Sequence, residues 1–160
     1  MKKWLIGFLA VVLTLLVGCA AAAEAGFQRS GDWCFRILED GTAEILYYWS
    51  FYDDAELHIP DELDGATVSQ IDSNFFRFSH VTAFTVSPTH PYFEVVDGVL
   101  FSKADKRLIA YPSHKEAAAY AIPEGTKIIG EDAFSHCENL TSITIPDSVR
   151  EIRDSAFAFC

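Results

Sequence analysis

Residues 129–137, IGEDAFSHC, return 23 positions later as IRDSAFAFC at residues 152–160 (152 − 129 = 23). The dipeptide Ile122-Pro123 also returns, as Ile145-Pro146, at the same offset (145 − 122 = 23). A fixed period of this length is typical of a solenoid, in which each unit buries its apolar side by stacking on the next. The sequence therefore predicts a stack of short repeats.

Each repeat is expected to contain a short strand and a tight turn. Ile143 and Ile145 share one face of the predicted strand because side chains alternate along a strand, and Pro146 ends it because proline has no N–H for the ladder. Residues 154–157 are expected to form a short helical turn that places Phe157 in the core. Four such strands predict two inward rows, which are Leu57, Phe84, Tyr120 and Ile143, and Ile59, Val86, Ile122 and Ile145.

Two segments depart from the repeat. Residues 93–112 hold two apolar runs around the polar turn 102–106, which predicts a β-hairpin inserted between two rungs. Residues 27–52 hold a second pair of runs around residues 39–42, which predicts an N-terminal hairpin that caps the first rung. The repeats themselves are expected over residues 53–160.

Residues 1–25 are expected to be a signal peptide. A basic pair precedes an apolar run at residues 4–17, a pattern typical of export and too short for a stable membrane span. Two cleavage sites stay open. A lipobox-like sequence ends at Cys19, which would be lipidated, whereas residues 23–25 permit cleavage before Gly26. We favour Cys19, so the expected product is an exported cell-surface lipoprotein, with a free secreted form as the alternative.

The charge of the chain restricts its partners. With 12 basic and 23 acidic residues the net charge is −11, which argues against nucleic acid and against electrostatic docking on anionic lipid. A membrane would be reached only through a lipid on Cys19. No nucleophile–base pair and no metal-ligand spacing is found, so no catalytic residue, metal or cofactor is expected.

The histidines and cysteines are given structural interpretations. The five histidines are interpreted as scattered surface residues, and they are His58, His80, His90, His114 and His136. Cys137 and Cys160 occupy the same repeat position, so buried free thiols are favoured over a bridge between them. Cys34 has no evident partner.

At these repeats the chain resembles the BspA-like (treponemal-type) leucine-rich repeats, whose pattern is roughly I-G-x-x-A-F-x-x-C-x-x-L-x-x-I-x-I-P-x-S-V-x-x-I. Residues 129–152 match nearly every specified position, and Arg153 departs from the pattern where it has Gly. The resemblance implies a β-rich, leucine-rich-repeat solenoid, an L-domain-like right-handed superhelix with short helical turns. Such proteins are usually secreted or on bacterial surfaces, and some are adhesins. No catalytic residues come with the family.

Two surfaces are candidates for binding. Alternation turns one row of small or polar side chains outward from the strand stack, and its candidate members are Glu56, His58, Thr85, Ser142 and Thr144. The aromatic stretch at residues 47–52 supplies a second candidate patch, consisting of Tyr47, Tyr48, Trp49 and Tyr52. Packing of the cap over the first rung is the favoured alternative for these aromatics.

Together these features predict a non-catalytic protein-interaction module on an exported bacterial surface protein, with an adhesin-like role as a candidate function. Its expected partner is a surface or matrix protein of a host or a neighbouring cell. The alternative is a structural spacer, or a displayed repeat fragment, without its own ligand.

Overall fold

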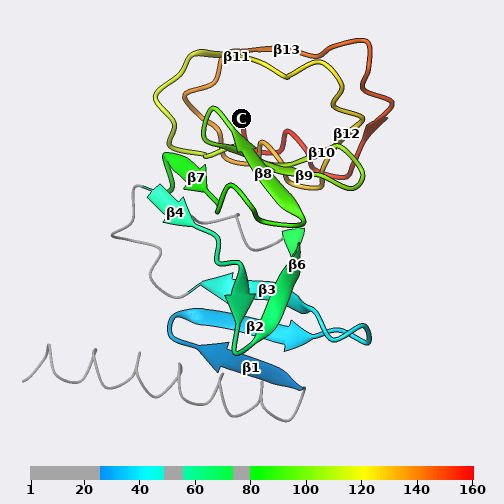
Figure 1. The fold of residues 1–160 in the computed structure, drawn as a ribbon. Coiled ribbons are helices and arrows are strands. Elements are labelled where there is room, and N and C mark those ends of the chain that lie inside the picture. Colours follow the sequence, from blue (N-terminus) through cyan, green and yellow to red (C-terminus); the bar gives the residue numbers. More distant parts are fainter. Residues whose placement is uncertain (1–25, 49–55, 74–79) are drawn as a thin grey trace, which may run out of the picture.

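The computed structural model describes residues 26–48, 56–73 and 80–160 (Figure 1). These ranges contain fourteen β-strands and no α-helix. The strands are β1 (Phe27–Ser30), β2 (Trp33–Ile37), β3 (Ala43–Tyr48), β4 (Glu56–His58), β5 (Glu62–Leu63), β6 (Ala66–Ile71), β7 (Ala83–Thr85), β8 (Phe93–Val96), β9 (Val99–Ser102), β10 (Arg107–Ala110), β11 (Ala119–Ala121), β12 (Ile128–Ile129), β13 (Ser142–Thr144) and β14 (Glu151–Ile152).

The N-terminal sheet has the order β1-β2-β3-β6-β5. The predicted capping hairpin is present as the antiparallel pair β2–β3, and β1, which the sequence reasoning missed, adds a third antiparallel strand. Strand β3 then pairs in parallel with β6, so the cap and the first rung share one sheet. Asp64 and Gly65 both have positive φ, at 49° and 85°, as a two-residue hairpin turn between β5 and β6 requires.

The outward strands pair as predicted, but in two separate sheets. Leu57 lies opposite Phe84 in the parallel pair β4–β7, and Tyr120 lies opposite Ile143 in the parallel pair β11–β13. The predicted single column of four rungs is therefore wrong at its middle, because β7 and β11 do not pair. In the last rung Ile145, expected to point inward, keeps 42% of its surface exposed.

The inserted segment fills the seam between these two pairs. The amide of Phe84 donates to the carbonyl of Gly98 at 2.9 Å, so the start of β9 takes the place of the missing rung. Gly98 has φ 75°, and a Cβ there would lie 3.2 Å from the Cβ of Ala83. The turn at Asp97-Gly98 thus needs glycine both for its backbone and for its close approach to β7.

The insertion has three strands where a single hairpin was expected. Strands β8, β9 and β10 are successively antiparallel, and β10 also pairs in parallel with β12. The resulting sheet has the order β14-β12-β10-β9-β8. Strand β10 therefore joins the insertion to the inner side of the C-terminal repeats.

The expected helical turns are successive β-turns. Ala133 donates to the carbonyl of Gly130 at 3.4 Å, and Ser135 donates to that of Asp132 at 2.9 Å. Asp132 and His136 have φ values of 53° and 60°, which a right-handed helix does not contain. The equivalent residues one repeat later, Ser155 and Phe159, have the same left-handed backbone.

The core consists of two apolar clusters. The N-terminal cluster includes Phe35, Ile45 and Phe84, and the C-terminal cluster is centred on Phe134, which is fully buried. The rungs are tied together by backbone bonds such as that from the Phe134 amide to the Ala156 carbonyl, at 2.7 Å. The predicted β-rich solenoid is thus confirmed, whereas the inserted segment has three strands and the turns between strands are not helical.

Candidate binding surfaces

The predicted outward row lies on the surface of the two parallel pairs. Glu56, His58, Ser142 and Thr144 are exposed, and Thr85 is half-buried. His58 Nδ1 and Thr85 Oγ1 are 3.2 Å apart, which links β4 to β7 across the face. The structure brings these two together, whereas Ser142 and Thr144 belong to the other pair, beyond the insertion.

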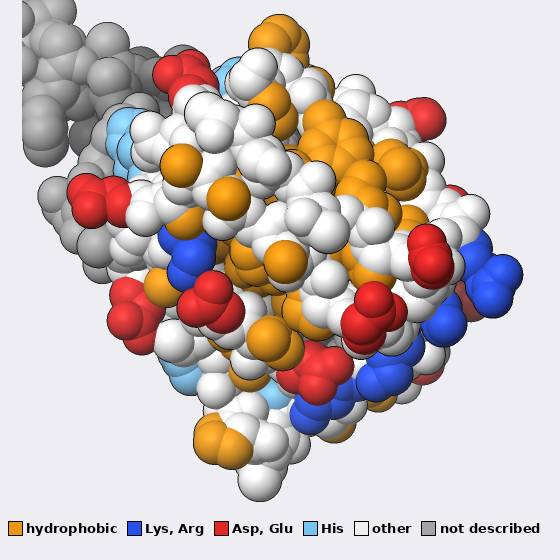
Figure 2. Space-filling view, turned by 90° about the horizontal axis from the view of Figure 1, so that it is seen from above, with side chains coloured by type: hydrophobic (Ala, Val, Ile, Leu, Met, Phe, Trp, Pro, Cys, Tyr) orange, Lys and Arg blue, Asp and Glu red, His pale blue; other side chains and the backbone are white. Residues whose placement is uncertain are grey.

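The middle of this face is formed by the insertion. Lys115 Nζ donates to the carbonyl of Asp97 at 2.8 Å and lies 3.6 Å from its carboxylate. This contact fixes the Asp97-Gly98 turn beside β7. Seen from the side of β11 and β13, hydrophobic side chains form a band across the surface, acidic side chains are scattered around it, and basic side chains gather along one rim (Figure 2).

The aromatic stretch is only partly within the described residues. Tyr47 keeps 52% of its surface exposed, whereas Tyr48 packs on Trp33 with ring centroids 4.5 Å apart. Tyr48 therefore serves the cap, and Tyr47 presents an aromatic face to solvent. Trp49, Tyr52 and the predicted lipidation residue Cys19 lie outside the described residues. No helix in the described part of the chain is long and apolar enough to cross a membrane.

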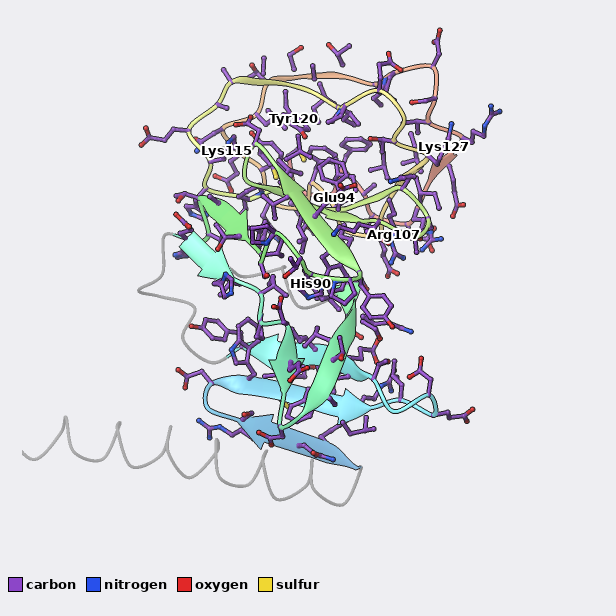
Figure 3. All side chains as sticks on the ribbon, in the orientation of Figure 1. His90, Glu94, Arg107, Lys115, Tyr120 and Lys127 are labelled. Atoms are coloured by element: carbon purple, nitrogen blue, oxygen red, sulfur yellow. The ribbon has the colours of Figure 1, made fainter. Side chains whose placement is uncertain are left out.

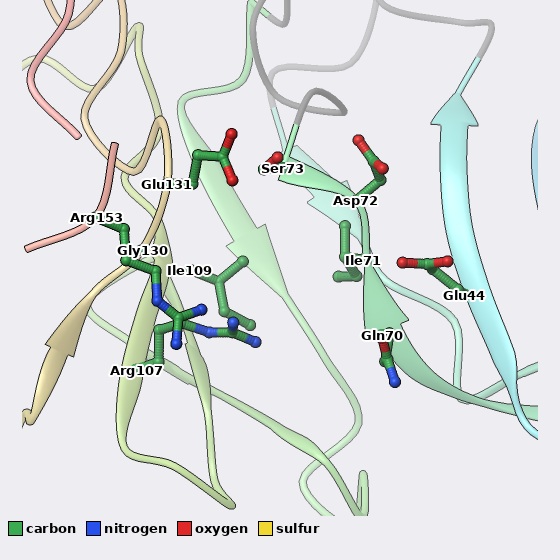
Figure 4. Close-up of a pocket in the computed structure, with 10 residues that line it drawn as sticks. All are labelled: Glu44, Gln70, Ile71, Asp72, Ser73, Arg107, Ile109, Gly130, Glu131 and Arg153. Atoms are coloured by element: carbon green, nitrogen blue, oxygen red, sulfur yellow. The ribbon is translucent and has the colours of Figure 1, made fainter. Parts of the chain in front are cut away.

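A groove that the sequence reasoning missed lies between the two five-stranded sheets (Figure 4). It encloses about 250 Å³. The wall from the N-terminal sheet consists of Glu44, Gln70, Ile71, Asp72 and Ser73, and the opposite wall consists of Arg107, Ile109, Gly130, Glu131 and Arg153. The signal for it was Arg153, which stands where the preceding repeat has Gly130.

Gly130 is needed in this wall for space. Its φ is not in the left-handed region, but a Cβ would lie 2.8 Å from the carbonyl oxygen of Leu108 and 3.5 Å from Cδ of Arg107. A Cβ that close to a backbone oxygen forces the rungs apart. The bare backbone at Gly130 therefore lets this rung lie close to β10.

One histidine is not on the surface. His90 is completely buried, contrary to the sequence-based interpretation, and lies between the N-terminal sheet and the rungs above it (Figure 3). Its Nδ1 accepts from the amides of Tyr92 and Phe93, each at 3.2 Å. Its carbonyl accepts from Lys103 Nζ at 2.5 Å. His90 thus organises the loop that begins the insertion, a role with no motif in the sequence.

The environment of His90 favours the neutral ring. Burial lowers its pKa, and this effect outweighs the opposing attraction of the Asp61 carboxylate. His90 Nε2 lies 4.0 Å from Asp61 Oδ1, and a hydrogen bond with the backbone of Pro60 also opposes the lowering of the pKa of His90. With Nδ1 acting as an acceptor, the proton of the neutral ring is on Nε2.

The buried thiol and phenols of the C-terminal cluster are held neutral. Burial raises the pKa of Cys137 to about 12 and that of Tyr111 to about 12, and it raises the pKa of Tyr120 as well. A protonated thiol is a poor nucleophile. Within the described ranges no three residues of the His, Cys, Asp and Glu types are grouped to hold a metal ion. Cys34, Cys137 and Cys160 form no disulfide; Cys137 is buried as expected, whereas Cys160 is exposed, contrary to the expectation that it is buried at the same repeat position.

Comparison with known proteins agrees with this architecture. The family described as "BspA type Leucine rich repeat region (6 copies)" matches residues 110–160. A leucine-rich repeat protein from Eubacterium ventriosum is 26% identical, with a TM-score of 0.57 over 65% of this chain and 27% of its own. The pneumococcal vaccine antigen PcpA is 29% identical, with a TM-score of 0.60 over 71% of this chain and 28% of its own.

The match to these two solved structures covers under a third of their length. No curated protein matches the chain. The 23-residue sequence period, the parallel register between rungs and the family match over residues 110–160 coincide in the C-terminal part. Residues 110–160 of the chain form a BspA-type leucine-rich repeat region.

Proposed function

We propose that this chain is a non-catalytic protein-interaction module displayed outside a bacterial cell, with an adhesin-like role. Proteins with BspA-type repeats are typically on bacterial surfaces or secreted, and their repeats generally mediate binding to other proteins. The likeness to a pneumococcal vaccine antigen supports a position accessible from outside the cell. Export would depend on residues 1–25, with a lipid on Cys19 or cleavage before Gly26.

The observation that carries this proposal is the parallel register of the outward rows. Glu56 lies opposite Ala83, and His58 opposite Thr85. Neighbouring strands are about 4.8 Å apart, so these side chains form a regular grid on a hydrogen-bonded backbone. A grid of short side chains loses little conformational entropy when a partner covers it.

The partner would contact two such grids and the turn between them. The β4–β7 pair carries Glu56 and His58, the β11–β13 pair carries Ser142 and Thr144, and Asp97 stands at the seam. Within the described part of the predicted patch, the exposed ring of Tyr47 is available as an anchor. The mature module would then combine a flat polar face with one aromatic contact.

Binding to an array of immobilised matrix and cell-surface proteins tests the proposal. Saturable binding to one of them is expected, and Ser142→Arg should weaken it at least about tenfold, because a long charged side chain on the grid blocks close contact. Gln28→Arg adds the same charge at an exposed position of β1 and should leave binding unchanged. Absence of saturable binding across the array would favour the spacer, which the lack of Trp and Arg on this face also fits.

A further inference from the structure

We propose that the groove between the two five-stranded sheets binds a carboxylate side chain of a peptide segment, taken from a stretch that carries both acidic and basic residues. The inference rests on the proposed protein-binding function and assigns the chemistry of one contact. It uses a different surface from the outward grid, because the groove is lined by β3, β6 and β10 and by the residues after β12 and β14.

The two arginines supply the site for the carboxylate. Arg107 and Arg153 line the same groove, and Figure 4 shows both guanidinium groups directed into it. Their side chains are 31% and 37% exposed. A guanidinium pairs with a carboxylate through two parallel N–H bonds, a fit that a lysine ammonium does not offer.

Each arginine has an acidic neighbour. Arg153 Nε donates to Glu151 Oε1 at 2.7 Å, and Arg107 Nε lies 3.5 Å from Asp105 Oδ2 without making a hydrogen bond within the described residues. These contacts occupy the Nε side of the two groups. The hydrogen bond to Glu151 orients the guanidinium group of Arg153, and Asp105 lies beside that of Arg107 without holding it by a hydrogen bond.

The convergence of the two arginines depends on their repeat positions. Ile109, Gly130 and Arg153 follow one another in adjacent rungs, since Leu108 pairs with Ile129 and Ile129 pairs with Ile152. The stem of Arg107 lies 3.5 Å from the place where a Cβ of Gly130 would stand. Gly130 is needed for its close approach to the Leu108 carbonyl, and the next rung has Arg153 at the same repeat position.

The remaining lining selects the kind of ligand. Asp72 and Glu44 line the wall from the N-terminal sheet, and Glu131 lines the opposite wall. Glu44 forms an ion pair with Arg36. These carboxylates and the net charge of −11 repel a polyanion such as a sulfated glycan. A peptide with a single Glu or Asp beside a Lys or Arg complements both the two arginines and the carboxylates of the groove. Ile71 and Ile109 offer an apolar surface to the stem of the entering side chain.

Titration of the purified chain with short peptides, followed by the Nε–H signals of its arginines in NMR spectra, tests the inference. The probe is Ac-Ala-Glu-Lys-Ala-amide, and the matched control is the same peptide with Gln in place of Glu. We expect saturable shifts of the Arg107 and Arg153 signals with the Glu peptide at millimolar concentration, and at least about tenfold weaker binding of the Gln peptide.

Variants of the chain complete the test. Arg153→Gly restores the residue of the preceding repeat and should abolish the saturable shift of Arg107, whereas Arg150→Gln removes the same charge at an exposed position outside the groove and should not. Equal binding of both peptides, no effect of Arg153→Gly, or tighter binding of a heparin-derived oligosaccharide would each overturn the inference. Partner binding through the outward grid would survive that result, so the two failures are distinguishable.

Discussion

The rings of Phe134 and Phe157 are stacked nearly parallel, with centroids 5.2 Å apart and planes 11° apart. They are one repeat apart in sequence (157 − 134 = 23). Phe134 also stacks on Tyr111 at 5.3 Å, and its side chain is completely buried. The ring of Phe134 therefore seals its rung and is itself stacked between Tyr111 and Phe157.

Replacing Phe134 with alanine should strongly destabilise the fold. The loss of a fully buried ring leaves a cavity between two rungs, and the expected cost is about 3–5 kcal/mol in the free energy of unfolding. Urea unfolding followed by circular dichroism measures it. The control is Phe159→Ala, where the ring is 67% exposed and the expected cost is under about 1 kcal/mol. Equal costs for the two variants would contradict the role given to Phe134.

Gly130→Ala should destabilise the C-terminal rungs. The added Cβ would lie 2.8 Å from the Leu108 carbonyl oxygen, and relieving that overlap is expected to cost about 1–3 kcal/mol. Arg153→Ala at the same position of the next repeat is the matched control, with an expected change within about 0.5 kcal/mol. The melting temperatures of both variants test this prediction. An unchanged melting temperature of Gly130→Ala would show that the neighbouring rungs move apart without cost.

Stability should fall as the pH drops below about 6.5, the ordinary pKa of histidine. The pKa of His90 is lowered in the folded chain, so below that value the unfolded chain binds the proton first. The contribution of neutral His90 is complete above pH 6.5 and is lost as the pH falls toward the folded pKa, at up to about 1.4 kcal/mol per pH unit. Asp61, Lys103 and His58 are the charged or titratable groups that act on it.

Urea unfolding at pH 7.5 and at pH 5.0 measures this loss. His90→Asn keeps an acceptor for the amides of Tyr92 and Phe93 but does not titrate, so its stability should differ less between the two pH values than that of the parent chain. The same pH dependence in both proteins would assign the loss to other groups.

Alkylation should distinguish the thiols. Cys137 is buried and its pKa is raised to about 12, so it is protonated at pH 8 and should not react with iodoacetamide while the chain is folded. Cys160 is exposed and should react first. Peptide mass mapping gives the order, with a urea-denatured sample as the control in which both react. Early modification of Cys137 would contradict its burial.

The repeat period predicted the rungs because residues at equivalent positions of successive repeats pack on one another. Tyr120 and Ile143 occupy equivalent positions, and the structure pairs them. The period could not predict the seam, because Gly98 takes the place of a rung from outside the repeat; its hydrogen bond from Phe84 and its close approach to Ala83 are seen only in the structure.

The candidate surfaces were predictable to a smaller extent. Alternation placed Glu56 and His58 outward, which needs only the geometry of one strand. The groove brings Arg107, Gly130 and Arg153 together from three different strands or turns. No local sequence pattern predicts that these residues lie side by side. His90 was misplaced because a buried histidine is recognised by the amides that bind it, and those come from the fold of its own loop.

The seam has a mechanical consequence when the stack is pulled along its axis. Load transmitted along the solenoid axis crosses from the first pair of outward strands to the second through the insertion, by way of backbone bonds from Phe84 to Gly98 and from His114 to Val81. We expect a stack of strands that is interrupted in this way to separate first at the seam, before the paired strands on either side separate. Extension under force would then begin at the Asp97-Gly98 turn and leave the rungs on either side folded.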